Sequence, residues 1–216
     1  MSIELNNHGF NQSEFLEVQE TTRLIVKRSA DLVELGMNYL DIEELILKLY
    51  EEFQVEKSWH PIKVRIDQDT NLSFREKSNP EIKVKNDSIF FMDIGVVKNG
   101  YEGDVGRSFS INKNPDAEKL INICHQVFVE SLSAWKNQKL SGKALYDFAA
   151  QAANSHGVEL NLSMDGHRIG SYPHGVFFKG GLAEVDIIPA ENLWILEIQV
   201  KCPQLNLSAF FEDVIN

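Results

Sequence analysis

Apolar positions recur with helical spacing in two pairs of segments, one pair in each half of the chain. Residues 13–36 carry the first pattern, with Ser13 at the expected N-cap position and Gly36 as the expected stop. Residues 40–53 carry the second, with Asp41 as its expected cap. The first half is therefore predicted to begin with two consecutive amphipathic helices.

The second half repeats this order. A long helical pattern begins near Asp116, just after Pro115, where proline suits the first turn of a helix. A further helix is predicted over residues 141–157, with Ser141 as the N-cap and Gly157 as the stop. The two halves share this order of elements, although their sequences are only weakly alike.

Each pair of helices is followed by strand patterns. Residues 89–97 are almost continuously apolar apart from Asp93. Asn99-Gly100, two residues that tolerate positive φ, follow them, so the stretch 89–111 predicts a hairpin. Residues 192–200 and 207–215 predict a second pair of strands near the C-terminus.

The intervening polar region, residues 54–81, allows one edge strand at Lys63–Ile66. The expected fold class is α+β, with helices on one face of a mostly antiparallel sheet. With 216 residues and no low-complexity linker, the chain is expected to form one domain over residues 1–216.

Composition narrows the classes of partner. The hydrophobic fraction of 43% can supply a core, and the formal net charge of -11 argues against nucleic acid or an anionic membrane surface as a partner. The chain shows neither a signal-peptide pattern nor an apolar run of transmembrane length. Cys124 and Cys202 are too few for a disulfide scaffold, so we expect reduced thiols and a cytoplasmic location.

Carboxylates interrupt the apolar strands at four places. These are Asp93, Asp104, Glu197 and Glu212. A buried, unpaired carboxylate costs several kcal/mol or takes up a proton, and basic residues within these strands are scarce. The glycine-rich stretch 165–181 adds His167 and His174. Two Asp, two Glu and one His suit a pair of Mn, Fe, Co or Zn ions about 3.5–4 Å apart.

Each of these residues alone has an ordinary structural interpretation. Asp93 and Asp104 suit turns, Glu212 suits a solvated chain end, and a lone His167 is more often hydrogen-bonded than ligating. The metal hypothesis depends on their combination, which is two hairpins with two acids each and a histidine loop between them.

At these residues the sequence resembles the methionine aminopeptidase, aminopeptidase P and creatinase superfamily. The stretch "DIGVVKNGYEGDVGRSF" carries Asp93 and Asp104, and "GHRIGSYPH" carries His167 and His174. Glu197 and Glu212, in the last two predicted strands, then match the family's last two acidic motifs in order. The resemblance implies the pita-bread fold, a pseudo-two-fold repeat of helices packed on a curved, mostly antiparallel sheet.

The resemblance also implies roles for these residues. Asp93 would bind one ion through both oxygens, Asp104 and Glu212 would bridge the pair, and His167 and Glu197 would complete the other ion. Glu197 would also shuttle a proton. His174 would donate to the developing oxyanion or the scissile amide. The implied activity is an aminopeptidase acting on small peptides, of the Xaa-Pro or methionine type, and a homodimer is left open.

Three features depart from the family pattern: Phe74, Arg168, and the sequence Glu197-Ile198-Gln199 where the family usually has Glu-Pro-Gly. Phe74 stands where the family carries a substrate-binding His, so substrate handling there is in question. His60 either supplies the lost function or has a structural role in its loop, and the structural role is favoured. Arg168 either narrows the pocket or binds a substrate carboxylate, or else it is exposed.

Two other functions stay open. One is a creatinase-like hydrolase that cleaves a C–N bond in a small metabolite, and the other is a catalytically silent binding protein. Phe74 and the changed surroundings of Glu197 favour the silent protein. The intact set of ligands favours a metal enzyme.

Overall fold

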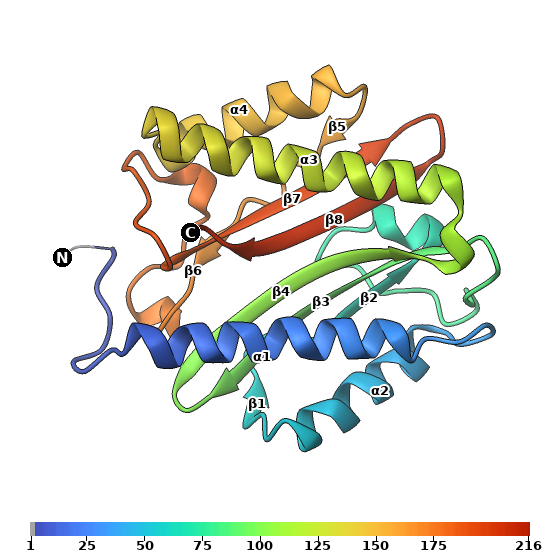
Figure 1. Cartoon of the computed structure of the whole chain (residues 1–216), viewed down its shortest axis with the longest axis horizontal. Coiled ribbons are helices and arrows are strands. Elements are labelled where there is room, and N and C mark those ends of the chain that lie inside the picture. Colours follow the sequence, from blue (N-terminus) through green and yellow to red (C-terminus); the bar gives the residue numbers. More distant parts are fainter. Residues whose placement is uncertain (1–2) are drawn as a thin grey trace.

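Two antiparallel hairpins form the centre of the fold, and helices cover one face of each (Figure 1). The computed structural model describes residues 3–216. The helices are α1 (Gln12–Asp31), α2 (Tyr39–Glu52), α3 (Pro115–Gln138) and α4 (Gly142–Ser155). The strands are β1 (Lys57–Ser58), β2 (Lys63–Ile66), β3 (Ile89–Lys98), β4 (Tyr101–Ser110), β5 (Glu159–Leu160), β6 (His167–Arg168), β7 (Trp194–Cys202) and β8 (Leu207–Val214).

The four long helices and both hairpins lie where the apolar pattern predicted them, but two helix starts differ. The N-cap of α1 is Asn11, whose Oδ1 accepts from the Ser13 backbone N–H at 3.0 Å. The N-cap of α2 is Asn38, and Asp41 instead closes the capping box from the third helical position. In both cases a polar residue just before the apolar period is the cap. Ser141 caps α4 as expected.

Helix α1 also ends earlier than predicted. Its last residue is Asp31, and Gly36 lies in the following loop with a φ of 89°. There the Gly36 N–H donates to the carbonyl of Val84 at 2.9 Å. The glycine therefore shapes the loop between α1 and α2 and does not terminate the helix directly.

Each half has its own hydrophobic core. One core lies mainly between α1, α2 and the strands β2 to β4, and Ile195 of β7 and Val214 of β8 join it. The other lies mainly between α3, α4 and the strands β7 and β8, and Ile89 of β3 joins it. In β3 the side chains of Met92, Ile94 and Val96 belong to the first core. Because side chains alternate along a strand, Asp93 and Gly95 face the opposite side of the sheet.

The two halves join where β4 pairs with β8. In this register Gly106 lies opposite Asp93 on one side and opposite Glu212 on the other. Glu197 lies directly opposite Glu212. A Cβ atom at Gly106 would lie 2.3 Å from the Phe210 ring and 2.9 Å from Glu212 Cβ. Glycine therefore permits close approach at the point where acids from both hairpins meet.

Two further expectations concern the whole chain. Cys124 and Cys202 are both free, as predicted. Within residues 3–216, no helix combines the length and the apolar character that crossing a bilayer requires.

Candidate metal centre

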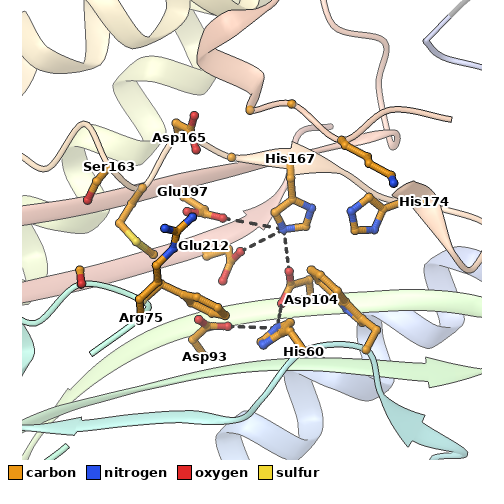
Figure 2. A pocket seen from close by; sticks show the side chains of 18 residues that line it. His60, Arg75, Asp93, Asp104, Ser163, Asp165, His167, His174, Glu197 and Glu212 are labelled. Carbon is orange, nitrogen blue, oxygen red and sulfur yellow. Dashed lines mark hydrogen bonds and ion pairs between the residues drawn. The ribbon is translucent and has the colours of Figure 1, made fainter. Parts of the chain in front are cut away.

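Asp104 lies between two imidazoles, one from each half of the fold (Figure 2). Its Oδ2 is 2.8 Å from His167 Nε2, and its Oδ1 is 3.2 Å from His60 Nε2. His60 Nε2 is also 3.4 Å from Asp93 Oδ1. The first hairpin thus contributes two carboxylates that face one another across a histidine.

The second hairpin completes the cluster. His167 Nε2 lies 3.6 Å from Glu212 Oε1 and 3.8 Å from Glu197 Oε1. The structure therefore brings all five predicted ligands into one cavity of about 540 Å³. His174 lines the same cavity, with its ring stacked 5.3 Å from the ring of His167.

Burial and mutual repulsion raise the pKa values of three of these acids. Burial is the largest cause that raises the pKa of Asp93 to about 6 and that of Glu197 to about 7, and neighbouring carboxylates add to both shifts. The same causes raise the pKa of Glu212 well above its usual range. Asp104 differs, because His60 and His167 outweigh its burial and lower its pKa to about 2.

The two histidines shift in the opposite sense to ordinary buried imidazoles. Burial disfavours the charged ring of His60, but Asp93 and Asp104 outweigh it and raise the pKa to about 9. Burial likewise opposes the charge on His167, and Asp104 and Glu212 raise its pKa well above the usual value. The cluster thus stabilises positive charge placed among the carboxylates.

These residues fit divalent cations. Glu212 Oε2 is buried and has no hydrogen-bond partner within the described residues, and Glu212 itself is 2% exposed. Such an oxygen is costly unless a cation or water satisfies it. Four carboxylates and imidazole nitrogens form an oxygen-rich donor set that suits Mn, Fe, Co or Zn. Two groups of closely spaced donor atoms share Asp104.

Helix α1 supports the cluster from the other face of the sheet. Gln19 holds Asp104 at two backbone atoms, because its Nε2 donates to the carbonyl at 2.6 Å and its Oε1 accepts from the N–H at 2.9 Å. Gln19 Nε2 also donates to Asp213 Oδ1 at 2.9 Å. Arg23 and Arg107 pair with Asp213, so this acid beside Glu212 is neutralised and adds no net charge to the cavity.

The predicted role of Arg168 needs correction. Its side chain is fully buried, so the exposed alternative is wrong. Its guanidinium donates to the carbonyls of Ile3, Leu5, Leu193 and Ile169 and does not line the cavity. The reason is strand alternation, since the preceding residue, His167, points into the cavity. Arg168 therefore anchors the N-terminal segment and does not reach a substrate carboxylate.

Phe74 and His60 both line the cavity, and their rings lie 5.8 Å apart. Phe74 is 39% exposed, with Lys63 Nζ 4.3 Å from its ring centroid. The His60 side chain is only 8% exposed and touches the acid cluster. The His60 side chain therefore reaches beyond its own loop to the acid cluster.

Several cavity residues were not identified from the sequence. Trp59 packs against His60, His167 and His174. Arg75 and Lys179 are exposed cations at the cavity wall. They lie in irregular segments, where no periodic pattern indicates which way a side chain points.

The fold is that of the pita-bread class, and the cluster is a candidate metal centre. The chain belongs to metallopeptidase family M24, whose family model matches residues 13–215. No curated protein matches the sequence significantly.

Solved structures share the fold at low sequence identity. An X-Pro aminopeptidase from Thermotoga maritima superposes with a TM-score of 0.77 at 16% identity, covering 95% of this chain and 58% of that one. A prolidase from Pyrococcus furiosus gives 0.72 at 14% identity, covering 95% and 61%. A methionine aminopeptidase from Thermotoga maritima gives 0.72 at 12% identity, covering 94% and 91%. The chain thus spans about three fifths of the length of the first two proteins.

Proposed function

We propose that this chain is a dinuclear metal-dependent hydrolase that removes the N-terminal residue of small peptides, as an Xaa-Pro or methionine aminopeptidase does. The observation that carries the proposal is the meeting of five candidate ligands in one cavity, where one buried Glu212 oxygen has no partner among residues 3–216. Membership of family M24 supports it. Similar folds in aminopeptidases and a prolidase agree with it.

The ligands divide between two positions. Asp93 would hold one ion and His167 with Glu197 the other. Asp104, which both groups of closely spaced donor atoms share, would bridge the ions together with Glu212. When bound, the ions supply Lewis acidity and lower the pKa of a water molecule towards neutrality.

The remaining steps fall to side chains of the cavity. Glu197 lines the same cavity, and we assign this carboxyl the role of accepting and returning a proton. His174 faces the same space, and we assign it the contact to the substrate carbonyl or scissile amide. Trp59, Phe74 and Met164 provide apolar wall, which excludes water around the reacting bond.

The test is to load the purified protein with Mn²⁺ or Co²⁺, count bound ions, and assay Xaa-Pro and Met-Xaa dipeptides. We expect two ions per chain and turnover on one of the two series. Asp104→Ala should lose both the two bound metal ions and the peptidase activity. Glu130→Gln, at a surface residue paired with His156, is the matched control and should retain both. A protein that binds two ions but cleaves no peptide would overturn the peptidase assignment.

A further inference from the structure

His60 reaches the acid cluster from a segment that supplies none of the five predicted ligands. It lies in the loop between β1 and β2, and its side chain is 8% exposed. His60, Asp93 and Asp104 each offer a donor atom, and these atoms all lie within 4.8 Å of one another. Asp104, His167 and Glu212 form a second group of the same kind.

The ring of His60 is oriented by its own backbone. Its Nδ1 lies 2.8 Å from the Pro61 carbonyl oxygen. A carbonyl only accepts, so Nδ1 carries the hydrogen and Nε2 turns towards the carboxylates. His167 is held in the same way, with Nδ1 2.6 Å from the carbonyl of Arg168. A hydrogen bond from the other ring nitrogen is the usual means of orienting a histidine that binds a metal.

The distances suit ligands that share an ion. Donor atoms bound about 2.1 Å from one ion lie roughly 3.0–3.4 Å apart for octahedral or tetrahedral angles. His60 Nε2 is 3.2 Å from Asp104 Oδ1 and 3.4 Å from Asp93 Oδ1. The same distances would also suit a proton on His60 Nε2 that is hydrogen-bonded to these carboxylates, so experiments must distinguish a bound metal ion from a proton.

The surroundings of His60 are shaped to admit its ring. Trp59 lies edge-on at 4.4 Å between ring centroids, and Phe74 closes the other side at 5.8 Å. Beneath it is Gly95, where a Cβ atom would lie 2.2 Å from His60 Cδ2 and 2.4 Å from Trp59 Nε1. Any side chain at position 95 would therefore displace both rings.

We propose that His60 is a sixth protein ligand, which binds one ion together with Asp93 and Asp104. Each of the two ions then receives one imidazole, His60 from the first half and His167 from the second, while Asp104 lies between them. This inference rests on the proposed metal centre and extends its ligand set.

The first test measures Co²⁺ binding by titration, with visible absorption and metal counts on the same samples. The native chain should bind two ions. His60→Ala should keep one ion at native affinity and weaken the other by at least the roughly 10- to 100-fold that loss of an outer-shell partner alone costs, with a changed visible spectrum. His156→Ala, which removes an imidazole paired with Glu130 at 3.1 Å, is the control and should change neither. Native affinities and an unchanged spectrum in folded His60→Ala would refute the proposal, whereas a native chain that binds no ion would refute the metal centre itself.

The second test needs no variant. In the Co²⁺-loaded native chain labelled with ¹⁵N-histidine, ligated rings give strongly shifted, exchangeable N–H signals in proton NMR. We expect two such signals, from the Nδ1–H groups of His60 and His167. A single shifted signal with two bound ions would mean that His60 carries a proton and binds no metal, and the sixth-ligand assignment would be wrong.

Discussion

Glu102 holds His174 at two points. Its Oε1 accepts the backbone N–H of His174 at 3.1 Å, and its Oε2 lies 2.7 Å from the ring Nδ1. Glu102 is 1% exposed, so the pair is shielded from solvent. A carboxylate has no hydrogen to give, so Nδ1 donates and the other ring nitrogen faces the cavity. We therefore interpret Glu102 as a positioning residue for His174.

Replacing Glu102 tests that role. In Glu102→Gln the amide can donate to Nδ1 and favour the opposite tautomer of His174. We expect kcat to fall on the order of 10²-fold, with KM and the number of bound ions unchanged. Steady-state kinetics on the metal-loaded variant, with a metal count, measures both. If stability drops while kcat is preserved, Glu102 has a structural role only.

Metal binding should release protons. The pKa values of Asp93 and Glu197 are raised to about 6 and about 7, and that of His60 to about 9. Ligands must be deprotonated to bind an ion, so an ion displaces these protons and its affinity should rise as the pH rises from 6 towards 9. Calorimetry in buffers of different protonation enthalpy measures the release directly. An affinity that stays constant over this range would contradict the shifts.

Gly106 should tolerate no side chain. Gly106→Ala places a Cβ 2.3 Å from the Phe210 ring, and overpacking of this kind costs about 1–3 kcal/mol. We expect a lower free energy of unfolding in urea for the metal-free protein, and weaker metal binding because Glu212 is displaced. Gly175→Ala is the matched control, since its nearest neighbour, Lys179 Cγ, would lie at 3.7 Å. Equal stability of the two variants would show that the sheet absorbs the methyl group.

Arg75 and Lys179 should favour substrates with a free carboxylate. Both line the cavity, whose other charged groups are largely acidic. Arg75→Ala should raise KM about tenfold for free-acid dipeptides, equivalent to about 1.4 kcal/mol. It should leave KM for the corresponding C-terminal amides unchanged. Rates measured on matched pairs of substrates decide the point, because an equal change on acid and amide would exclude carboxylate recognition by Arg75.

Periodicity predicted the elements better than it predicted their ends. The hairpin around Asn99-Gly100 forms as expected, with both residues at positive φ. Asn11 and Asn38 were missed as N-caps in favour of Ser13 and Asp41. The apolar pattern starts inside each helix and so does not mark the residue just before it. The acid cluster was predictable because carboxylates in apolar strands need a partner, and Asp104 did find partners across the sheet.

Other parts of the site depend on tertiary placement. His60 was assigned to a structural loop, since nothing local to "SWHPIK" shows that the loop folds over Gly95 onto the cluster. Arg168 was predictable in principle, because a residue adjacent to an inward-pointing His167 must point away from the cavity. Arg75 and Lys179 follow no periodic pattern, so only the folded chain reveals their position.

The pairing of β4 with β8 builds the candidate metal centre from residues of both halves of the chain. Each hairpin carries only two of the four candidate carboxylate ligands, so two metal ions would need ligands from both hairpins. Bound ions would thus link the two halves across the β4–β8 pairing, and their binding free energy would stabilise the association of the halves. Removing the ions with a chelator should then destabilise the β4–β8 pairing before either hydrophobic core unfolds. Amide hydrogen exchange would increase first along β4 and β8.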